Sequence, residues 1–231
     1  YLEVLSKECE LVSAQIGGNK EVVQLHFGGG SPTFLNNEEI FQVMDIIRSH
    51  FTLAPDAEIS IEVDPRSTPV DKVEVLAKAG FNRMSIGVQD FDNRVQIAVN
   101  RVQPFEMTKA VLDAARANGF KSINMDLIYG LPFQSRKTFE MTLDKVIELS
   151  PDRIALYHFA HLPEHFKPQR RINAEDLPST PEKVGIMMDL IEKKMNKTTR
   201  TAHITDIRPY ITNCTVDIIC ETAMGIKMSG Q

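Results

Sequence analysis

Hydrophobic and polar positions along the chain predict strands and helices in turn. Alternating apolar and polar residues are typical of half-buried strands, and apolar residues three or four apart are typical of amphipathic helices. The predicted strands cover residues 22–27, 58–64, 83–89, 122–128 and 153–160. The predicted helices cover residues 2–16, 36–51, 69–79, 92–99, 105–118, 135–149 and 181–195, with a polar loop at 161–179. The pattern therefore predicts an α/β fold in which strand and helix alternate five times.

Polar strand faces favour a barrel over an open sheet. In the second predicted strand, Ile61 and Val63 lie on one face, and Glu62 and Asp64 lie on the other. Three other predicted strands alternate in the same way. Parallel strands that helices cover on both faces are apolar on both faces, as in a Rossmann-type sheet. A polar face on successive strands instead predicts a parallel (β/α) barrel whose lumen surrounds a ligand.

Three consecutive glycines, Gly28 to Gly30, end the first predicted strand and are followed by Ser31. Glycine has no Cβ, so its backbone adopts positive φ and approaches a ligand closely. The helix that follows presents free N–H groups toward the same space. The stretch therefore predicts a site for an anionic or carboxylate-bearing small molecule.

Polar side chains at the other strand ends extend this prediction, because ligand groups gather at the carboxyl ends of barrel strands. Glu62 and Asp126 can accept hydrogen bonds from an amine or from ribose hydroxyls. Arg101, in the connection after the third strand, can pair with a carboxylate. The remaining candidates at these ends are Asp64, Gln89, Asp90 and Ala160.

Composition narrows the class of protein. The chain has 231 residues, 42% of them hydrophobic, and a net charge of −5, which argues against nonspecific binding of nucleic acid. No apolar run approaches the roughly 20 residues that a membrane helix needs. The three cysteines are too few for a disulfide scaffold, so we expect a cytoplasmic protein. Because the chain does not begin with Met, we expect a fragment that lacks an N-terminal part.

Four motifs carry a resemblance to a known family. Residues 1–195 resemble the oxygen-independent coproporphyrinogen III oxidases, which are radical S-adenosylmethionine (SAM) enzymes. The motifs are His26–Thr33, Ser60–Arg66, Asn82–Phe91 and Asn124–Pro132. The resemblance implies a partial TIM-like (β/α) barrel of the radical SAM type, truncated at its N-terminus. It also implies oxidative decarboxylation of two propionates of coproporphyrinogen III to vinyl groups, which gives protoporphyrinogen IX in haem biosynthesis.

The same resemblance implies a set of cofactor-binding residues. Gly29 and Glu62 would contact the SAM that sits on a [4Fe–4S] cluster. The cluster gives an electron to SAM, and the resulting 5′-deoxyadenosyl radical takes hydrogen from a propionate. The residues that would contact a second SAM are Gly30, Ser31, Gln89, Arg101, Asp126 and Ala160. Ser31 stands where the family commonly has Thr, which keeps the hydroxyl.

The resemblance also implies partners. Coproporphyrinogen III carries four carboxylates, so Lys167, Arg170 and Arg171 in the polar loop are candidate partners for its propionates. A solvated basic loop is the alternative interpretation of these three residues. An electron donor such as a flavodoxin-type protein and a monomeric state are expected as well.

The cysteines depart from the family pattern. The family holds its cluster with a Cys-x₃-Cys-x₂-Cys stretch, because cluster irons need thiolate ligands. Cys9, Cys214 and Cys220 do not have that spacing. We therefore expect the ligands to lie in a full-length parent, and we expect this chain alone to hold no cluster and to be inactive.

The C-terminal part departs from the family too. Residues 196–205 form a polar break between the radical SAM core at 1–195 and the rest. Residues 206–231 resemble an internal helical segment of a microsomal haem-thiolate monooxygenase. We therefore expect an unrelated, poorly docked helical tail and a chimeric or mis-joined gene, with an unusual natural C-terminus as the alternative.

Two other functions stay open at this point. A radical SAM haem chaperone shares the glycine stretch, but it usually lacks the Asp-Pro-Arg that Asp64 begins here. An unrelated metal-dependent barrel enzyme could use His158, His161 and His165, whose spacing suits zinc on a helix. Pro163 interrupts a helix at that place, so we predict no metal site.

Overall fold

The computed structural model describes residues 1–18 and 20–198. The chain divides into two compact units, Tyr1–Asp189 and Leu190–Gln231. The tail predicted at 206–231 lies outside the described residues. All the strands of the described part belong to the first unit, which holds the candidate site.

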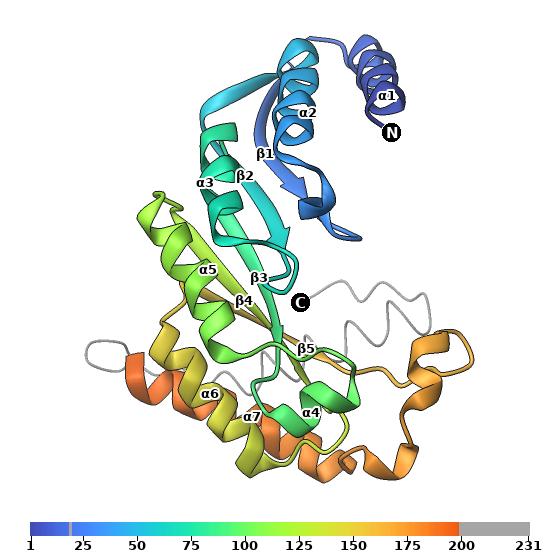
Figure 1. Cartoon of the computed structure of the whole chain (residues 1–231), viewed down its shortest axis with the longest axis vertical. Coiled ribbons are helices and arrows are strands. Elements are labelled where there is room, and N and C mark those ends of the chain that lie inside the picture. Colours follow the sequence, from blue (N-terminus) through green and yellow to red (C-terminus); the bar gives the residue numbers. More distant parts are fainter. Residues whose placement is uncertain (19, 199–231) are drawn as a thin grey trace, which may run out of the picture. The chain divides into compact units, whose positions relative to one another are not determined.

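Five parallel strands form one sheet in sequence order. They are β1 (Glu21–Phe27), β2 (Thr52–Val63), β3 (Arg83–Gln89), β4 (Ser122–Tyr129) and β5 (Arg153–His158). A Rossmann-type sheet reverses its strand order partway, whereas a barrel adds each strand beside the last. The sequential order therefore confirms the predicted partial barrel, which is a curled α/β half-barrel (Figure 1).

Helices alternate with these strands as predicted. They are α1 (Leu2–Gln15), α2 (Asn37–His50), α3 (Val70–Ala79), α4 (Asn93–Ala98), α5 (Phe105–Ala117), α6 (Arg136–Leu149) and α7 (Thr180–Thr198). Short 3₁₀ turns lie at η1 (Pro32–Phe34), η2 (Lys167–Arg171) and η3 (Ala174–Asp176). The predicted loop at 161–179 therefore contains two of these turns, η2 and η3. Among the helices of the described residues, none combines the length and the apolarity that a bilayer span requires.

The two faces of the sheet differ as the alternation predicts. Ile61 and Val63 are 1% and 3% exposed on the face that packs against helices. Glu62 and Asp64, on the opposite face, are only half-buried. Helices α2, α3, α5 and α6 lie along the apolar face (Figure 1). Within the described part of the chain, these helices thus lie on the apolar side, and the polar face can surround a ligand.

Strand β2 begins earlier than the pattern predicts. Thr52 and Leu53 pair with Glu21 and Val22 of β1, and the register then shifts. Pro55 falls in that irregular stretch, where no ladder donor is lost. Proline ordinarily argues against a strand interior, so the sequence pattern did not predict the first half of β2.

The glycine stretch is fastened to its surroundings by the residues that follow it. Asn36 and Glu39 form a reciprocal capping box at the start of α2, with bonds of 2.9 and 2.7 Å. The ammonium of Lys72, on α3, donates to the carbonyls of Thr33 and Leu35. These contacts fix the turn after Gly30 between α2 and α3.

Candidate functional site

A polar pocket of about 310 Å³ lies at the carboxyl ends of β2, β3 and β4, beside the glycine stretch. It brings together most of the residues predicted to contact SAM. Those that line it are Gly30, Ser31, Glu62, Gln89, Arg101 and Asp126. Asp64, Arg66 and Ser85 line it as well. Residues up to 96 positions apart in sequence thus converge through the parallel sheet, from Gly30 to Asp126.

The remaining two predicted residues lie outside this lining. The N–H of Gly29 donates to Glu62 Oε2 at 3.2 Å, so Gly29 stands directly beside the pocket. The carbonyl of Ala160 accepts from Gln169 Nε2 at 3.0 Å. Ala160 therefore belongs to the loop after β5 rather than to the pocket wall.

Backbone geometry explains why glycines occupy this stretch. Gly29 and Gly30 have φ of 71° and 52°, which side-chain-bearing residues rarely adopt. No heavy atom lies within 4 Å of where their Cβ atoms would be, so their backbone faces open space. A Cβ on Gly28 would lie 2.5 Å from His26 Nε2 and 2.8 Å from Glu62 Oε1. The absence of a Cβ at Gly28 therefore lets these two side chains lie close to the backbone.

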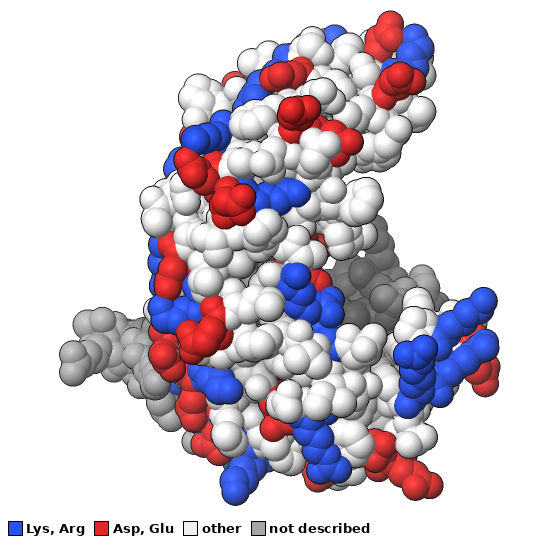
Figure 2. Space-filling model, viewed as in Figure 1, with Lys and Arg blue, Asp and Glu red and all other residues white. Residues whose placement is uncertain are grey.

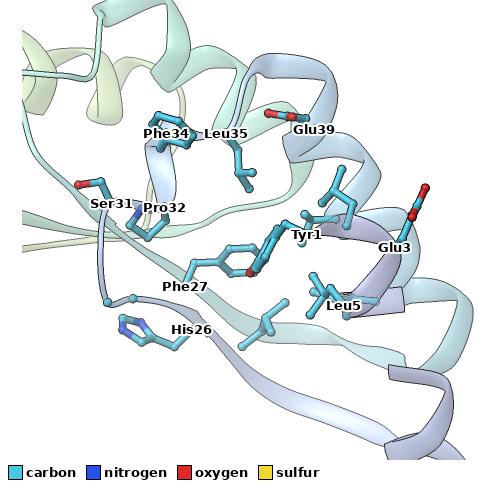
Figure 3. Close-up of a pocket in the computed structure, with 16 residues that line it drawn as sticks. Tyr1, Glu3, Leu5, His26, Phe27, Ser31, Pro32, Phe34, Leu35 and Glu39 are labelled. Atoms are coloured by element: carbon cyan, nitrogen blue, oxygen red, sulfur yellow. The ribbon is translucent and has the colours of Figure 1, made fainter. Parts of the chain in front are cut away.

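A second, larger cavity of about 900 Å³ meets the first at the glycine stretch. It runs between α1, α2 and β1 and shares Ser31 and Pro32 with the polar pocket. Figure 3 shows the rings of Tyr1 and Phe27 close together inside it, with His26 and Ser31 toward the glycine end. The glycine backbone thus separates an apolar cavity from a polar one.

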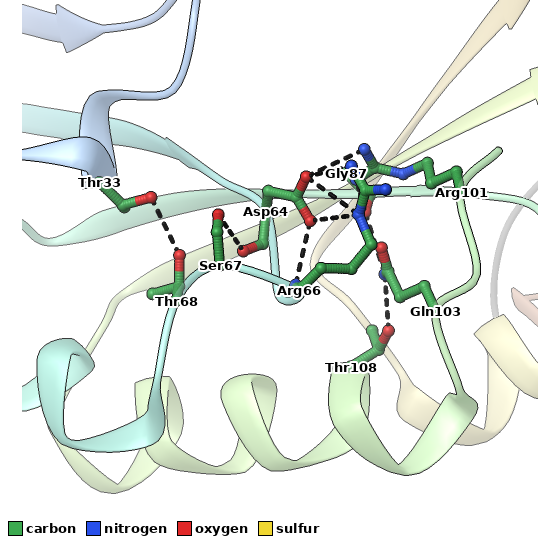
Figure 4. A network of polar contacts seen from close by, with 9 residues as sticks. All are labelled: Thr33, Asp64, Arg66, Ser67, Thr68, Gly87, Arg101, Gln103 and Thr108. Atoms are coloured by element: carbon green, nitrogen blue, oxygen red, sulfur yellow. Dashed lines mark hydrogen bonds and ion pairs between the residues drawn. The ribbon is translucent and has the colours of Figure 1, made fainter.

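Two arginines converge on Asp64 in the wall of the polar pocket (Figure 4). Arg66 Nη2 lies 2.7 Å from Asp64 Oδ2, and Arg101 Nη1 lies 3.1 Å from the same oxygen. Arg101 Nη2 also donates to the carbonyl of Gly87 at 2.9 Å. The buried Nε of Arg101 has no hydrogen-bond partner among the described residues. Arg101 is therefore held rigidly and keeps one donor for a ligand.

The pKa of the Asp64 carboxyl lies below its ordinary value. Burial alone raises that pKa, but the hydrogen bonds from Arg66 and the charges of Arg101 and Arg66 outweigh it. The Asp64 carboxylate is thus ionised in the folded protein at neutral pH, and it pairs with the guanidinium groups of Arg66 and Arg101.

Asp126 has the opposite environment. Its oxygens accept from Ser85 Oγ at 2.9 Å and from Asn124 Nδ2 at 2.7 Å. Burial is the main cause that raises the pKa of Asp126, and the negative charge of Glu62 adds to it. The oxygens of Asp126 can also accept hydrogen bonds from ligand groups such as ribose hydroxyls.

Sequence patterns missed one side chain in the lumen, Tyr157 of β5. The charge of Asp126 is the first cause that raises the pKa of this phenol, followed by burial and by the charge of Glu62. Tyr157 pairs in the sheet with Ile128, which lies two residues after Asp126 and therefore on the same face of β4. The period-two pattern of β4, extended to β5, could have identified it.

Asp90 is not a ligand-facing residue, although it follows a strand end. Its side chain is 1% exposed and accepts from Thr142 Oγ1 at 2.6 Å and from Gln134 Nε2 at 2.5 Å. The preceding residue, Gln89, has a φ of 66°. The buried carboxylate thus fixes the turn that carries Gln89 into the pocket.

The residues proposed for substrate and for metal are distributed differently. Of the three basic residues of η2, Arg171 lines a neighbouring cavity, and Lys167 and Arg170 do not. Among the described residues, no three His, Cys, Asp or Glu side chains form a group that could hold a metal ion. His158 instead lies against the ring of Tyr129, with centroids 5.1 Å apart.

The described residues fit SAM and do not fit an iron–sulfur cluster. Open glycine backbone, two half-buried carboxylates and an unpaired arginine donor suit a small molecule with amino, carboxylate and ribose groups. Cys9, on α1, is the one cysteine within residues 1–18 and 20–198. A cluster needs several thiolates, so this part of the chain does not supply its ligands.

Replacement of Asp64 tests the arginine network. Asp64→Asn should lower the free energy of unfolding by about 1–2 kcal/mol at pH 7, because two charge-assisted contacts are lost. The lowered folded-state pKa gives wild type a stabilisation that is present above the unfolded value of about 3.9 and is lost as pH falls through the folded value. The gap between wild type and variant should therefore close below about pH 4 in urea titrations.

Asp113→Asn, in an exposed pair with Lys109 on α5, is the matched control and should show almost no gap at either pH. A gap for Asp64→Asn that is as large at pH 3 as at pH 7 would contradict the ionised network.

Comparisons with known proteins agree with this geometry. Residues 6–146 match the radical SAM superfamily. The chain is 47% identical over 195 residues to the oxygen-independent coproporphyrinogen III oxidase of Pseudomonas aeruginosa, covering 84% of this chain and 42% of that protein. It is also 47% identical over 191 residues to the enzyme of the same name from Escherichia coli K12, covering 83% and 42%.

The solved structure of coproporphyrinogen III oxidase from Escherichia coli superposes with a TM-score of 0.82 at 46% identity. The match covers 85% of this chain and 45% of that one. This chain therefore spans less than half the length of the relatives that it matches. The family match extends over more than half of the chain and coincides with the half-barrel and its glycine stretch, and the chain therefore belongs to the radical SAM superfamily.

Proposed function

We propose that this chain is the SAM-binding core of an oxygen-independent coproporphyrinogen III oxidase. The reaction oxidatively removes carbon dioxide and a hydrogen from each of two propionate side chains of coproporphyrinogen III, leaving vinyl groups and giving protoporphyrinogen IX. The observation that carries the proposal is the pocket at the strand ends, where six residues implied by the family resemblance converge. The relatives at 47% identity carry the name of this enzyme, which supports the oxidase rather than the haem chaperone.

The proposed SAM contacts follow from the chemistry of each group. Gly29 and Glu62 serve one SAM, with the Glu62 carboxylate accepting from its amino group and the open glycine backbone facing its carboxylate. A second SAM is assigned to Gly30, Ser31, Gln89, Arg101, Asp126 and Ala160. In that set the unpaired Nε of Arg101 offers a donor and Asp126 accepts from hydroxyls. When bound at these residues, SAM would supply the radical chemistry that acts on a propionate.

The cofactor set includes a [4Fe–4S] cluster, whose ligands we place outside residues 1–198. Inactivity of this chain alone stays a prediction. The flavodoxin-type electron donor, the monomeric state and the cytoplasmic location also stay predictions, since none of them follows from the half-barrel itself.

We also propose the division of the chain into a core at 1–195, a polar break at 196–205 and an unrelated tail at 206–231. The chimeric origin of that tail rests on its sequence resemblance to a haem-thiolate monooxygenase segment. Sequencing the transcript across residues 190–231 tests it, and one continuous natural message would contradict a mis-joined gene.

Ligand binding by the full chain tests the function. Under anaerobic conditions, calorimetric titration should show binding of coproporphyrinogen III and of SAM, because the described residues form the polar pocket and a neighbouring cavity that contains Arg171. Haemin is the comparison ligand and should bind more weakly than coproporphyrinogen III. Tight binding of haemin with no binding of coproporphyrinogen III would contradict the oxidase and favour the haem-chaperone function.

A further inference from the structure

We propose that the cavity between β3, β4, α4 and η2 receives one propionate-bearing pyrrole of the tetrapyrrole, with Arg171 as the partner of its carboxylate. The inference rests on the proposed function and names the part of the substrate that this cavity takes. The observations that carry it are the composition of the cavity wall, the state of its two arginines and its position beside the SAM pocket.

The cavity wall suits an apolar ring that ends in an anion. Its volume is about 360 Å³, which is at the small end of ligand pockets and fits one arm of a larger molecule. Its apolar side chains are Ala98, Val99, Ile128, Leu131, Phe159, Pro168 and Ile172. The charged residues that line it are both arginines, and no Asp or Glu contributes to the lining that the described residues provide.

The two arginines of the wall are not equivalent. Arg101 is already paired with Asp64 at 3.1 Å and bonded to the carbonyl of Gly87. Arg171 makes no side-chain hydrogen bond or ion pair to any described residue. Its guanidinium is therefore the one that can give a carboxylate a full two-point contact.

Neighbouring cations do not compete for this role. Lys and Arg atoms gather over the segment that contains η2 (Figure 2, right). Of these, Arg170 uses its Nε to bond the carbonyl of Pro163 at 3.2 Å, and neither Arg170 nor Lys167 lines the cavity. Of the three candidate partners for a propionate, Lys167, Arg170 and Arg171, we therefore keep Arg171 alone for this cavity.

The segment that carries Arg171 is held in place. Gln169, also in the cavity wall, donates through Nε2 to the carbonyl of Ala160 at 3.0 Å. Its Oε1 accepts from the N–H of Leu162 at 2.5 Å. This two-point bond fastens η2 to the chain that leaves β5, so Arg171 is presented to the cavity from a fixed turn.

The cavity also adjoins the proposed SAM pocket. Gln89 and Arg101 line both spaces, so a pyrrole arm in one lies directly beside a ligand in the other. A carboxylate anchored by Arg171 would hold the tetrapyrrole next to the strand ends.

Two neighbouring variants of the full chain test the proposal. Arg171→Gln should weaken binding of coproporphyrinogen III by about tenfold or more, as expected for loss of a charge-assisted pair. Arg170→Gln, the matched control with the same charge change outside the cavity, should bind within about twofold of wild type. The tetramethyl ester of coproporphyrinogen III, which lacks carboxylates, should bind equally to all three proteins.

Equal affinity of wild type, Arg170→Gln and Arg171→Gln for coproporphyrinogen III would overturn the role of Arg171 while leaving the proposed function intact. A larger loss for Arg170→Gln would overturn it as well. Failure of wild type to bind coproporphyrinogen III at all would instead contradict the proposed function, and the inference with it. Equal SAM affinity in the three proteins is the check that each variant is folded.

Discussion

Asp90→Ala should lower the free energy of unfolding by about 2–3 kcal/mol, the largest effect that we expect from a single polar replacement in this chain. Three donors converge on the carboxylate: Thr142 Oγ1, the N–H of Asp92 and Gln134 Nε2, at 2.5–2.7 Å. Removal of the acceptor leaves these donors unsatisfied in the interior. Burial raises the pKa of Asp90, so relief of that burial offsets part of the cost.

Asp90→Asn should not rescue the loss. The amide of Gln134 cannot turn around, because its Oε1 already accepts from the N–H groups of Gly130 and Leu131. In either orientation, the NH₂ group of Asn at position 90 would thus face a donor, which is Gln134 Nε2 in one orientation and the N–H of Asp92 in the other. For a unit of this size, 1 kcal/mol corresponds to about 2–4 °C, so Tm should fall by about 4–12 °C in Asp90→Ala.

Thermal unfolding followed by circular dichroism measures this effect. Asp113→Ala, an exposed position on α5, is the control and should leave Tm within the error of the measurement. An Asp90→Ala protein as stable as wild type would show that the three donors do not depend on this carboxylate.

Gly28→Ala should reduce SAM affinity by about tenfold or more while changing stability little. The new Cβ would lie 2.5 Å from His26 Nε2 and 2.8 Å from Glu62 Oε1. Both are ends of flexible side chains, so they can swing away without disturbing the strand. Glu62 would then leave the N–H of Gly29, to which it is now bonded at 3.2 Å, and with it the proposed contact to SAM.

Gly17→Ala is the matched control, because no heavy atom lies within 4 Å of its new Cβ. Calorimetric titration of SAM into wild type and both variants, together with their Tm values, separates binding from folding. Unchanged SAM affinity in Gly28→Ala would contradict the assignment of Glu62 to the cofactor.

The fold was predictable because its signals are local and periodic. Alternation of Ile61 and Val63 with Glu62 and Asp64 identified both the strand and the polar lumen, and the structure buries the first pair. In the structure, the strands lie in the sheet in the same order as in the chain, and this order distinguishes the barrel from an open sheet. The start of β2 was less predictable, because Pro55 argues against a strand interior when only the sequence is considered. The pairing of Thr52 and Leu53 with β1, which shows that the strand begins there, is seen only in the structure.

The candidate site was predictable only where a motif marked it. The glycines and Glu62 lie in recognisable stretches and converge as expected. The roles of Asp90 and Lys72 could not be predicted, because each depends on partners more than 30 positions away, Gln134 and Thr33. A charged residue at a strand end looks the same in sequence whether it faces a ligand or is buried beneath the turn.

A crystal structure of this chain soaked with SAM tests the central claim most directly. The geometry predicts electron density for SAM at the carboxyl ends of β2, β3 and β4, with its amino-carboxylate end against Gly29 and Glu62. SAM bound elsewhere, such as in the apolar cavity beside Tyr1 and α1, with the polar pocket free of density, would contradict it.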